Sequence, residues 1–275
     1  MKEIFKNNFY LSENFVKVFE PFIKINYIQL KNKKIPVYNK KTIGWHTYST
    51  EEIKELNKKG IKVSLLKKGE GDYSYHFIPC KNYEEAYQNY NKNFKKNVRR
   101  AERNNLIFTE KGDLNNLMKI HIKRMTELNT LTFPKKYFEH LKGLDFVKIF
   151  YVKKDEKTIA FGLAFENEDC VYFSQASDLK EFRNLRTGYF LYDQMIKYAT
   201  SKGKYLHTGI IKTNSGHATF KERMGASKLQ ALSVPEDNKL RLFQFALKFS
   251  FTGFLLRSYS KNFFKSFLGN AIPFT

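Results

Sequence analysis

Apolar and polar residues alternate along this chain in ways that distinguish strands from helices. Strict alternation predicts strands, and apolar residues repeated every three or four positions predict helices. In the first eighty residues this pattern predicts a capped helix at 49–60 and strands at 23–30, 34–38, 62–66 and 73–80. A basic helix follows from about Glu84 to Asn104.

The pattern becomes more regular after the basic helix. Amphipathic helices are predicted at 114–129 and 134–144, and strands joined by short polar turns at 146–152, 158–165 and 170–177. A polar loop at 179–188 then precedes a helix at 189–203, a strand at 205–210, a helix at 215–225 and a strand at 228–234. A meander followed by strand–helix–strand crossovers predicts an α/β (α+β) fold with a mixed, mostly antiparallel sheet flanked by helices.

The last segment, 237–275, is rich in Phe and Leu but is interrupted by Arg and Lys. These charges leave no apolar stretch of the roughly 20 residues that a transmembrane helix needs. Two interpretations stay open for this basic amphipathic segment. It packs as a helix on the domain, or it lies on an anionic membrane surface.

Composition limits the class of protein. The 275 residues are 42% hydrophobic and 16% aromatic, which is sufficient for a core. The two cysteines, Cys80 and Cys170, give no disulfide framework, and no secretory signal is evident at the start of the sequence. We therefore expect a cytoplasmic protein, either free or in peripheral contact with the inner face of the membrane.

The net charge of +22 favours a polyanionic partner. Arginine is more informative here than lysine, because its planar fork suits phosphate. On the predicted basic helix, Arg99 and Arg103 share one face with two lysines, and Arg100 lies beside them. These three arginines are candidates for binding phosphate or substrate, against the simpler interpretation of a solvated charged face.

The loop at 179–188 is a second candidate site. It precedes a helix, and the free N–H groups at a helix start suit a pyrophosphate. Arg183 and Arg186 add positive charge there, and Gly188 permits close approach of a ligand to the backbone. An ordinary loop leading into a buried helix explains the same residues equally well.

The stretch from Lys204 to Ala226 predicts a strand, a polar loop and a helix that contains Lys221. Spacing alone indicates a surface lysine at this position. His207 and His217 lack partners at metal-ligand spacing, so no metal site is predicted, and His207 is expected to be a packed strand residue. No Walker loop, nucleophile elbow or GxGxxG sequence is present.

Taken in order, these segments resemble the Fem-type aminoacyl ligases and the Fem-related GNAT-like acetyltransferases. NKNFKKNVRRAERNNL is similar to a Ser-x-Lys-x-Arg…Arg-Lys-Ala-x-x-x-Gly segment, with Asn91 in place of Ser and Asn105 near the Gly. NSGHATFKERMGA is similar to the family's Ser-x-Gly…Phe-Lys-x-x-Phe-Gly pattern, with Met224 in place of Phe. The resemblance extends from about Tyr83 to Val234.

The resemblance implies a domain plan and a reaction. Residues 1–82 would form a reduced N-terminal GNAT-like copy, 83–236 the acyltransferase domain and 237–275 a basic helical tail. The reaction would transfer an acyl or aminoacyl group from acyl-CoA or aminoacyl-tRNA to an amine, with no permanently bound cofactor. A cell-envelope, glycan or amino-sugar precursor is the expected acceptor.

The resemblance also implies roles for particular residues. Backbone N–H groups around Ser174 and Gln175 would polarise the carbonyl, and Lys221 would stabilise negative charge or hold a phosphate. The loop before the long helix would bind the CoA pyrophosphate, although Arg186 replaces the Gly that is usual at the first position of this loop. The candidate residues of the loop are Arg183, Asn184, Arg186, Thr187, Gly188 and Tyr189. No general base is evident, and Asp178 and Glu166 are the carboxylates considered. The alternative function is a catalytically silent basic module that binds RNA or an anionic membrane.

Overall fold

The chain forms two compact units in the computed structural model, which describes residues 13–22, 24–30, 33–38, 40–42, 50–62, 73–128 and 132–230. The first unit comprises Met1–Gly71 with Ala231–Thr275, and the second comprises Asp72–Gln230. The predicted strand at 62–66 and the tail at 237–275 lie wholly or mostly outside the described residues.

The described part of the first unit is a small antiparallel sheet with two helices. Its elements are α1 (Glu13–Phe19), β1 (Asn26–Leu30), β2 (Lys33–Tyr38), β3 (Lys41–Thr42) and α2 (Thr50–Lys58). Leu30, Ile35, Val37, Leu56 and Ile61 form its own buried core. The strands expected at 23–30 and 34–38 and the helix expected at 49–60 are thus present, and the relation of this unit to a reduced GNAT-like copy stays a prediction.

The second unit contains a seven-stranded sheet in the order β10-β4-β9-β8-β7-β6-β5. Its strands are β4 (Tyr73–Ile78), β5 (Ile107–Thr109), β6 (Val147–Lys154), β7 (Lys157–Glu166), β8 (Cys170–Asp178), β9 (Tyr205–Lys212) and β10 (Ser227–Gln230). All neighbouring strands are antiparallel except β8 and β9, which are parallel. The expected mixed, mostly antiparallel sheet flanked by helices is confirmed; the short edge strand β5 was not predicted.

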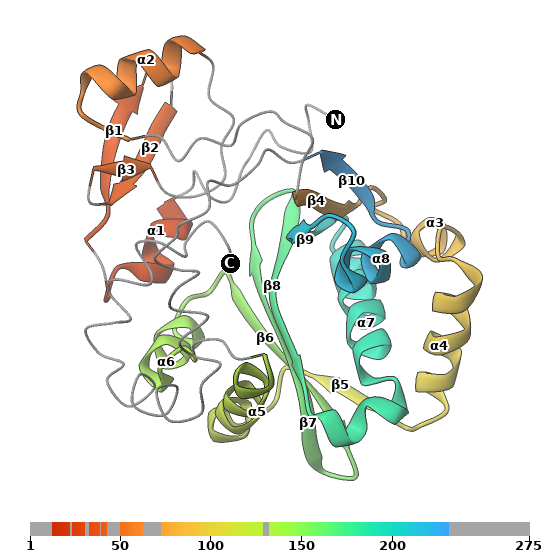
Figure 1. Cartoon of the computed structure of the whole chain (residues 1–275). Coiled ribbons are helices and arrows are strands. Elements are labelled where there is room, and N and C mark those ends of the chain that lie inside the picture. The colour runs from red at the N-terminus through yellow and green to blue at the C-terminus, as the bar shows by residue number, and fades with distance from the viewer. Residues whose placement is uncertain are drawn as a thin grey trace. The chain divides into compact units, whose positions relative to one another are not determined.

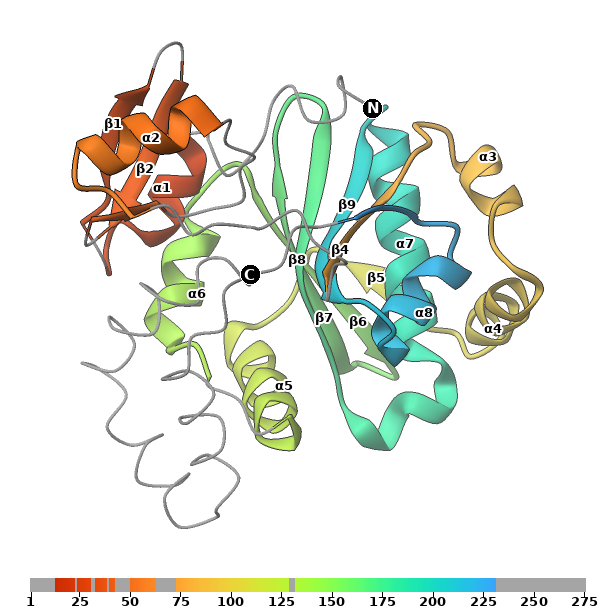
Figure 2. The ribbon, with the colours of Figure 1, turned by 45° about the horizontal axis from the view of Figure 1, so that its top comes forward.

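Helices cover both faces of this sheet (Figures 1 and 2). One face carries α3 (Tyr83–Gln88), α4 (Lys92–Glu102), α7 (Thr187–Ser201) and α8 (Gly216–Arg223), and the other carries α5 (Leu114–Glu127) and α6 (Lys135–Lys142). A 3-10 helix, η3 (Lys180–Leu185), connects β8 to α7. The β8–α7–β9 segment is therefore the crossover that makes one pair of strands parallel.

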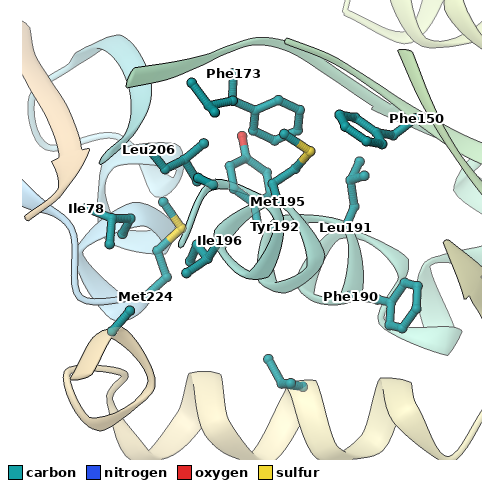
Figure 3. Close-up of a cluster of buried hydrophobic side chains, with 14 of the residues drawn as sticks. Ile78, Phe150, Phe173, Phe190, Leu191, Tyr192, Met195, Ile196, Leu206 and Met224 are labelled. Carbon is teal, nitrogen blue, oxygen red and sulfur yellow. The ribbon is translucent and has the colours of Figure 1, made fainter. Parts of the chain in front are cut away.

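The apolar core lies between the sheet and α7 (Figure 3). Leu191, Met195 and Ile196 of α7 are at most 1% exposed and pack against residues of β8 and β9 such as Phe173 and Leu206. Asp193, also fully buried, accepts hydrogen bonds from the hydroxyls of Tyr83 (2.8 Å) and Tyr90 (3.0 Å), which fasten α3 to α7. The core thus fixes the helix that follows β8.

The expected single basic helix at 84–104 is wrong, because the structure has two helices there. Asn91 is the N-cap of α4, and its side chain accepts a hydrogen bond from the backbone N–H of Phe94 (2.8 Å). Asn and Ser are both strong N-cap residues, which explains how Asn91 replaces the Ser of the resembling segment. Asn105 has a φ of 50°, a left-handed conformation that Gly and Asn adopt more easily than other residues.

The boundary between the units differs from the expected one. We expected the acyltransferase domain to begin at residue 83, whereas the second unit begins at Asp72. The reason is that β4 pairs with both β9 and β10 and so completes the sheet from an earlier part of the chain. Among the described residues, no helix has the length and apolar character needed to cross a membrane.

Candidate active site

The two parallel strands of the sheet pair over only part of their length. The paired residues are Cys170 with Tyr205, Val171 with Leu206, and Tyr172 with His207. Beyond Tyr172 and His207 the strands continue to Asp178 and Lys212 without pairing to each other. The sheet therefore opens between β8 and β9, which leaves backbone groups on both strands available to a ligand.

A β-bulge lies on each strand just where they separate. On β8, Phe173 pairs with Ala164 and Gln175 pairs with Leu163, so Ser174 is the extra residue. On β9, His207 pairs with Phe77 and Gly209 pairs with His76, so Thr208 is the extra residue. Bulges re-aim backbone and side-chain groups and occur often beside active sites. Sequence alternation did not indicate either bulge.

Lys221 of α8 points to the bulge on β9. Its ammonium donates a hydrogen bond to the backbone carbonyl of Thr208, and the residue is only 3% exposed. Burial lowers the pKa of this amine to about 7. The surface position that spacing indicated for Lys221 is therefore wrong. The amine is buried and can act as either a cation or a neutral base near neutral pH.

Other polar atoms around this opening lack partners. In the described part of the chain, Ser74 Oγ, both ring nitrogens of His76 and Gln175 Oε1 are buried without a hydrogen bond. Ser74 and His76 belong to β4, and Thr208 Oγ1 donates to the carbonyl of His76 (3.0 Å). A buried unpaired polar atom costs about 1–3 kcal/mol, so these atoms, on the two strands that flank β9, are candidates for contact with a polar ligand.

The expected donor-binding loop lies between the end of β8 and the start of α7. Arg186 has a φ of 62° and precedes α7 without a side-chain cap, so no side chain occupies the first turn. A Cβ added at Gly188 would meet nothing within 4 Å, and Thr187 Oγ1 donates to Phe182 O (2.8 Å). The left-handed φ at Arg186 explains why Gly is usual there.

Arg183 already has acidic partners in this loop. Its guanidinium contacts Asp178 (3.1 Å) and Glu127 of α5 (2.9 Å). Burial alone would lower the pKa of this guanidinium, but hydrogen bonds to these carboxylates raise it. Arg183 therefore holds the loop to β8 and α5, which leaves Arg186 as the loop arginine with no ion pair among the described residues.

The basic face predicted for α4 is present and exposed. Lys92, Lys96 and Arg103 are exposed, whereas Phe94, Val98 and Ala101 on the other side are fully buried. Arg99 Nε donates to the Tyr87 hydroxyl at 3.3 Å. The C-terminal end of α4 meets the loop between β8 and α7, because Asn104 Nδ2 donates to Leu185 O (3.1 Å). The fold thus brings the end of the Arg99–Arg103 segment beside the loop that contains Arg183 and Arg186.

The two carboxylates considered as general bases are both engaged elsewhere. Asp178 accepts from Arg183, at the far end of β8. Glu166 accepts from the Tyr198 hydroxyl and lies 3.4 Å from Lys204 Nζ, near the closed end of the strand pair. Neither carboxylate lies beside Lys221.

His207 is a packed strand residue, as expected. It is 1% exposed, contacts the Tyr75 hydroxyl through Nδ1 and lies 3.1 Å from Cys170 Sγ through Nε2. Burial lowers its pKa to about 3 and raises that of Cys170 to about 12, so both groups are neutral. Within the described ranges, no group of three or more His, Cys, Asp and Glu residues is arranged to hold a metal ion.

Sequence reasoning missed His76, Ser74 and Thr208. Ser74 and His76 are far from Lys221 in the sequence, and His76 meets Thr208 across 132 residues, whereas Thr208 lies 13 residues before Lys221. No local motif marks them, and only the pairing of β4 with β9 brings them to the opening. Ser174, Gln175 and Lys221 were named beforehand, and the structure places them at the two bulges.

No family model matches the sequence, and no curated protein matches it either. Solved structures do match in fold. FemX aligns with a TM-score of 0.64 at 12% identity, over 86% of this chain and 94% of that one. L-PGS from Bacillus licheniformis aligns with a TM-score of 0.54 at 12% identity, over 86% and 96% of the two chains.

A third structure gives the same result. The C-terminal domain of a putative lysylphosphatidylglycerol synthetase from Agrobacterium fabrum aligns with a TM-score of 0.54 at 11% identity, over 84% and 90% of the chains. At such low identities the likeness concerns the fold. This chain therefore has a Fem-like, GNAT-like fold.

Proposed function

We propose that the second unit is an acyltransferase that moves an acyl or aminoacyl group from acyl-CoA or aminoacyl-tRNA to an amine. The observation that carries the proposal is the opening between β8 and β9, with a bulge on each side and the buried Lys221 amine at one of them. The fold shared with FemX, with L-PGS and with the C-terminal domain of a putative lysylphosphatidylglycerol synthetase supports the same reaction class.

The chemistry suits these groups. The amine nitrogen of the acceptor attacks the acyl carbonyl carbon, and the carbonyl oxygen becomes an oxyanion. The carbonyl then re-forms as the C–S or C–O bond to the donor breaks, and the proton that the amine nitrogen loses balances the one that the leaving thiolate or alkoxide takes up. Backbone N–H groups at the Ser174 bulge and the protonated Lys221 would stabilise that oxyanion. A buried ammonium acts strongly because little water screens its charge.

The donor would lie along the start of α7. Its phosphates would meet the uncapped first turn from Thr187 to Tyr189, with Arg186 adding charge and Gly188 allowing close approach. Arg183 would act indirectly, by holding the loop through Asp178 and Glu127. The acceptor is proposed to be a cell-envelope, glycan or amino-sugar precursor.

A donor screen tests the proposal. Acyl-CoAs and charged tRNAs are offered to the full chain with a panel of amines, and transfer is followed by mass spectrometry. Lys221→Met should lower transfer by about 10²–10³-fold, the loss typical of removing one oxyanion donor. Lys119→Met, which changes an exposed lysine, should leave transfer unchanged. If no donor transfers and none binds, the proposal fails.

Two further variants separate the donors. With a CoA donor, Arg186→Gln should raise KM for the donor several-fold while Arg103→Gln changes little. With a tRNA donor, Arg99→Gln with Arg103→Gln should raise KM and flatten the dependence of binding on salt, because each lost phosphate contact lowers that slope.

The exposed basic face of α4 favours a second candidate function, a silent module that binds RNA or an anionic membrane. Such a module would bind its partner in a salt-dependent manner and would show no turnover with any donor. Vesicles with and without anionic lipid, and RNA, are the probes that distinguish its two partners.

A further inference from the structure

Lys221 has one histidine on its own helix, α8, and another on β4. His217 precedes it by four residues on α8, so the two side chains lie on the same face of the helix. His76 lies on β4, on the same side as Ile78, which packs into the core beneath α7 and α8. Lys221 is 3% exposed and His76 is 0% exposed, whereas His217 is exposed to solvent.

These three groups interact electrostatically. The protein around each ring lowers the pKa of His76 and His217, and the positive charge of Lys221 lowers it further. His76 in turn lowers the pKa of His217. Both rings are therefore neutral near neutral pH, and each has a lone pair available on one nitrogen.

The two histidine rings have few hydrogen-bond partners among the described residues. His217 Nε2 lies 3.4 Å from the Tyr192 hydroxyl of α7, and neither ring nitrogen of His76 bonds to any described residue. The other charged groups that act on the two histidines are Glu222 of α8, Lys228 of β10 and Arg124 of α5.

We propose that His217 exchanges protons between the buried Lys221 amine and solvent, and that His76 is the second proton acceptor beside that amine. In this step an N–H bond of the Lys221 ammonium breaks and the proton bonds to the imidazole lone pair of His217. The imidazolium then gives a proton to water or buffer, and the reverse sequence charges Lys221 again. No electrons are transferred, and the charge moves from amine to ring to solvent.

The inference rests on the proposed function, because Lys221 stabilises the oxyanion only in its protonated form and must regain any proton that it loses. A lysine that is 3% exposed and bonded to Thr208 O has little direct contact with water. The exposed ring of His217, on the same helix face, offers a route from this amine to solvent. His217 therefore acts through Lys221 and does not itself stabilise the oxyanion.

Proton exchange at Lys221 is measured by NMR on the full chain labelled with ¹⁵N-lysine, with its signal identified by its loss in Lys221→Met. In His217→Gln we expect the titration midpoint of Lys221 to stay close to that of the unmodified chain. The exchange rate of its protons should fall about tenfold or more, and imidazole added to the buffer should restore it. His140→Gln, on α6 at the other face of the sheet, is the matched control.

His76→Gln tests the buried end of the path. It should also slow the exchange, but added imidazole should not restore it, because His76 is fully buried. An unchanged exchange rate in His217→Gln, or a slowed rate that imidazole does not restore, overturns the proposal. Since the measurement uses no acyl donor, its outcome is independent of the donor screen.

Discussion

Lys221 illustrates the conflict between function and stability at a single residue. Burial lowers the pKa of its amine from 10.5 to about 7, because the charged form is poorly solvated inside the protein. The unfolded chain thus binds a proton below about pH 10, and the folded chain binds it only below about pH 7. The folded state therefore loses stability as pH falls through this range.

We predict that Lys221→Met stabilises the protein at pH 6 while it lowers transfer. Removing this titrating amine raises the free energy of unfolding at pH 6, and the loss of the hydrogen bond to Thr208 O offsets part of the increase. The net increase is about 3 kcal/mol. Urea unfolding at several pH values measures it, and the gain should shrink towards pH 10. A variant that is less stable than the unmodified chain at pH 6 would contradict this account.

His121 of α5 is a buried histidine that also lowers the stability of the folded state in acid. Its Nε2 accepts a hydrogen bond from the backbone N–H of Phe133 (3.0 Å), and its ring packs on Phe133, Phe138 and Phe161. Burial lowers its pKa to about 4. The folded state therefore resists protonation of this ring, and stability falls as the pH drops from about 6.5 to about 4.

We expect His121→Gln to be less stable than the unmodified chain at pH 7, because the ring contacts are lost. The glutamine still offers a hydrogen-bond acceptor to the Phe133 N–H but does not titrate. The loss of stability between pH 7 and pH 4 should therefore be smaller by about 3 kcal/mol. Free energies of unfolding at pH 7 and pH 4, compared between the two proteins, give this difference directly. Equal losses in both proteins would show that His121 is already protonated or exposed in the fold.

At the scale of elements, the bulge on β9 determines where the sheet opens. Thr208 is the extra residue, and Gly209 beside it has a φ of 81°. Residues other than glycine rarely adopt this backbone conformation. A Cβ at Gly209 would meet nothing within 4 Å, so the conformation of the backbone, and not crowding, requires glycine here.

Gly209→Ala should therefore destabilise the protein by about 1–2 kcal/mol through backbone strain, and it should lower transfer by shifting the Thr208 carbonyl. Gly216→Ala is the matched control. Gly216 also has open space around it but lies in the first turn of α8, where alanine is the better helix former by about 1 kcal/mol or less. Thermal unfolding of both variants tests the contrast, and equal effects would refute it.

At the scale of the whole molecule, β4 decides where the second unit begins. It lies between β9 and β10, and without it β10 would have no partner in the sheet. The N-terminal unit has its own core of five residues, led by Leu30 and Leu56. The two units are thus separately packed parts of one chain.

We predict that a fragment of residues 72–230 folds cooperatively, whereas one of residues 83–230 does not. The shorter fragment lacks β4 and exposes the edge of β9, which removes two strand pairings and invites aggregation. Circular dichroism and the cooperativity of urea unfolding distinguish the two fragments. A cooperatively folded 83–230 fragment would show that β4 is dispensable.

The sequence by itself determined most elements of the second unit, apart from β5 and the division between α3 and α4, because their alternation and helical spacing are strong and local. It also indicated the meander, the crossover and the exposed basic face of α4, all of which depend on nearby residues. The break between α3 and α4 was missed because a single Asn91 cap ends one helical pattern and begins another.

Only the tertiary structure decided which polar groups meet. His76, Thr208 and Lys221 come from β4, β9 and α8, and strand pairing across 132 residues brings the first two together. The burial of Lys221, and with it the lowered pKa, likewise depends on packing that no local pattern encodes. Hydrophobic periodicity specifies which face of an element is buried, but pairing between distant strands specifies what that face meets.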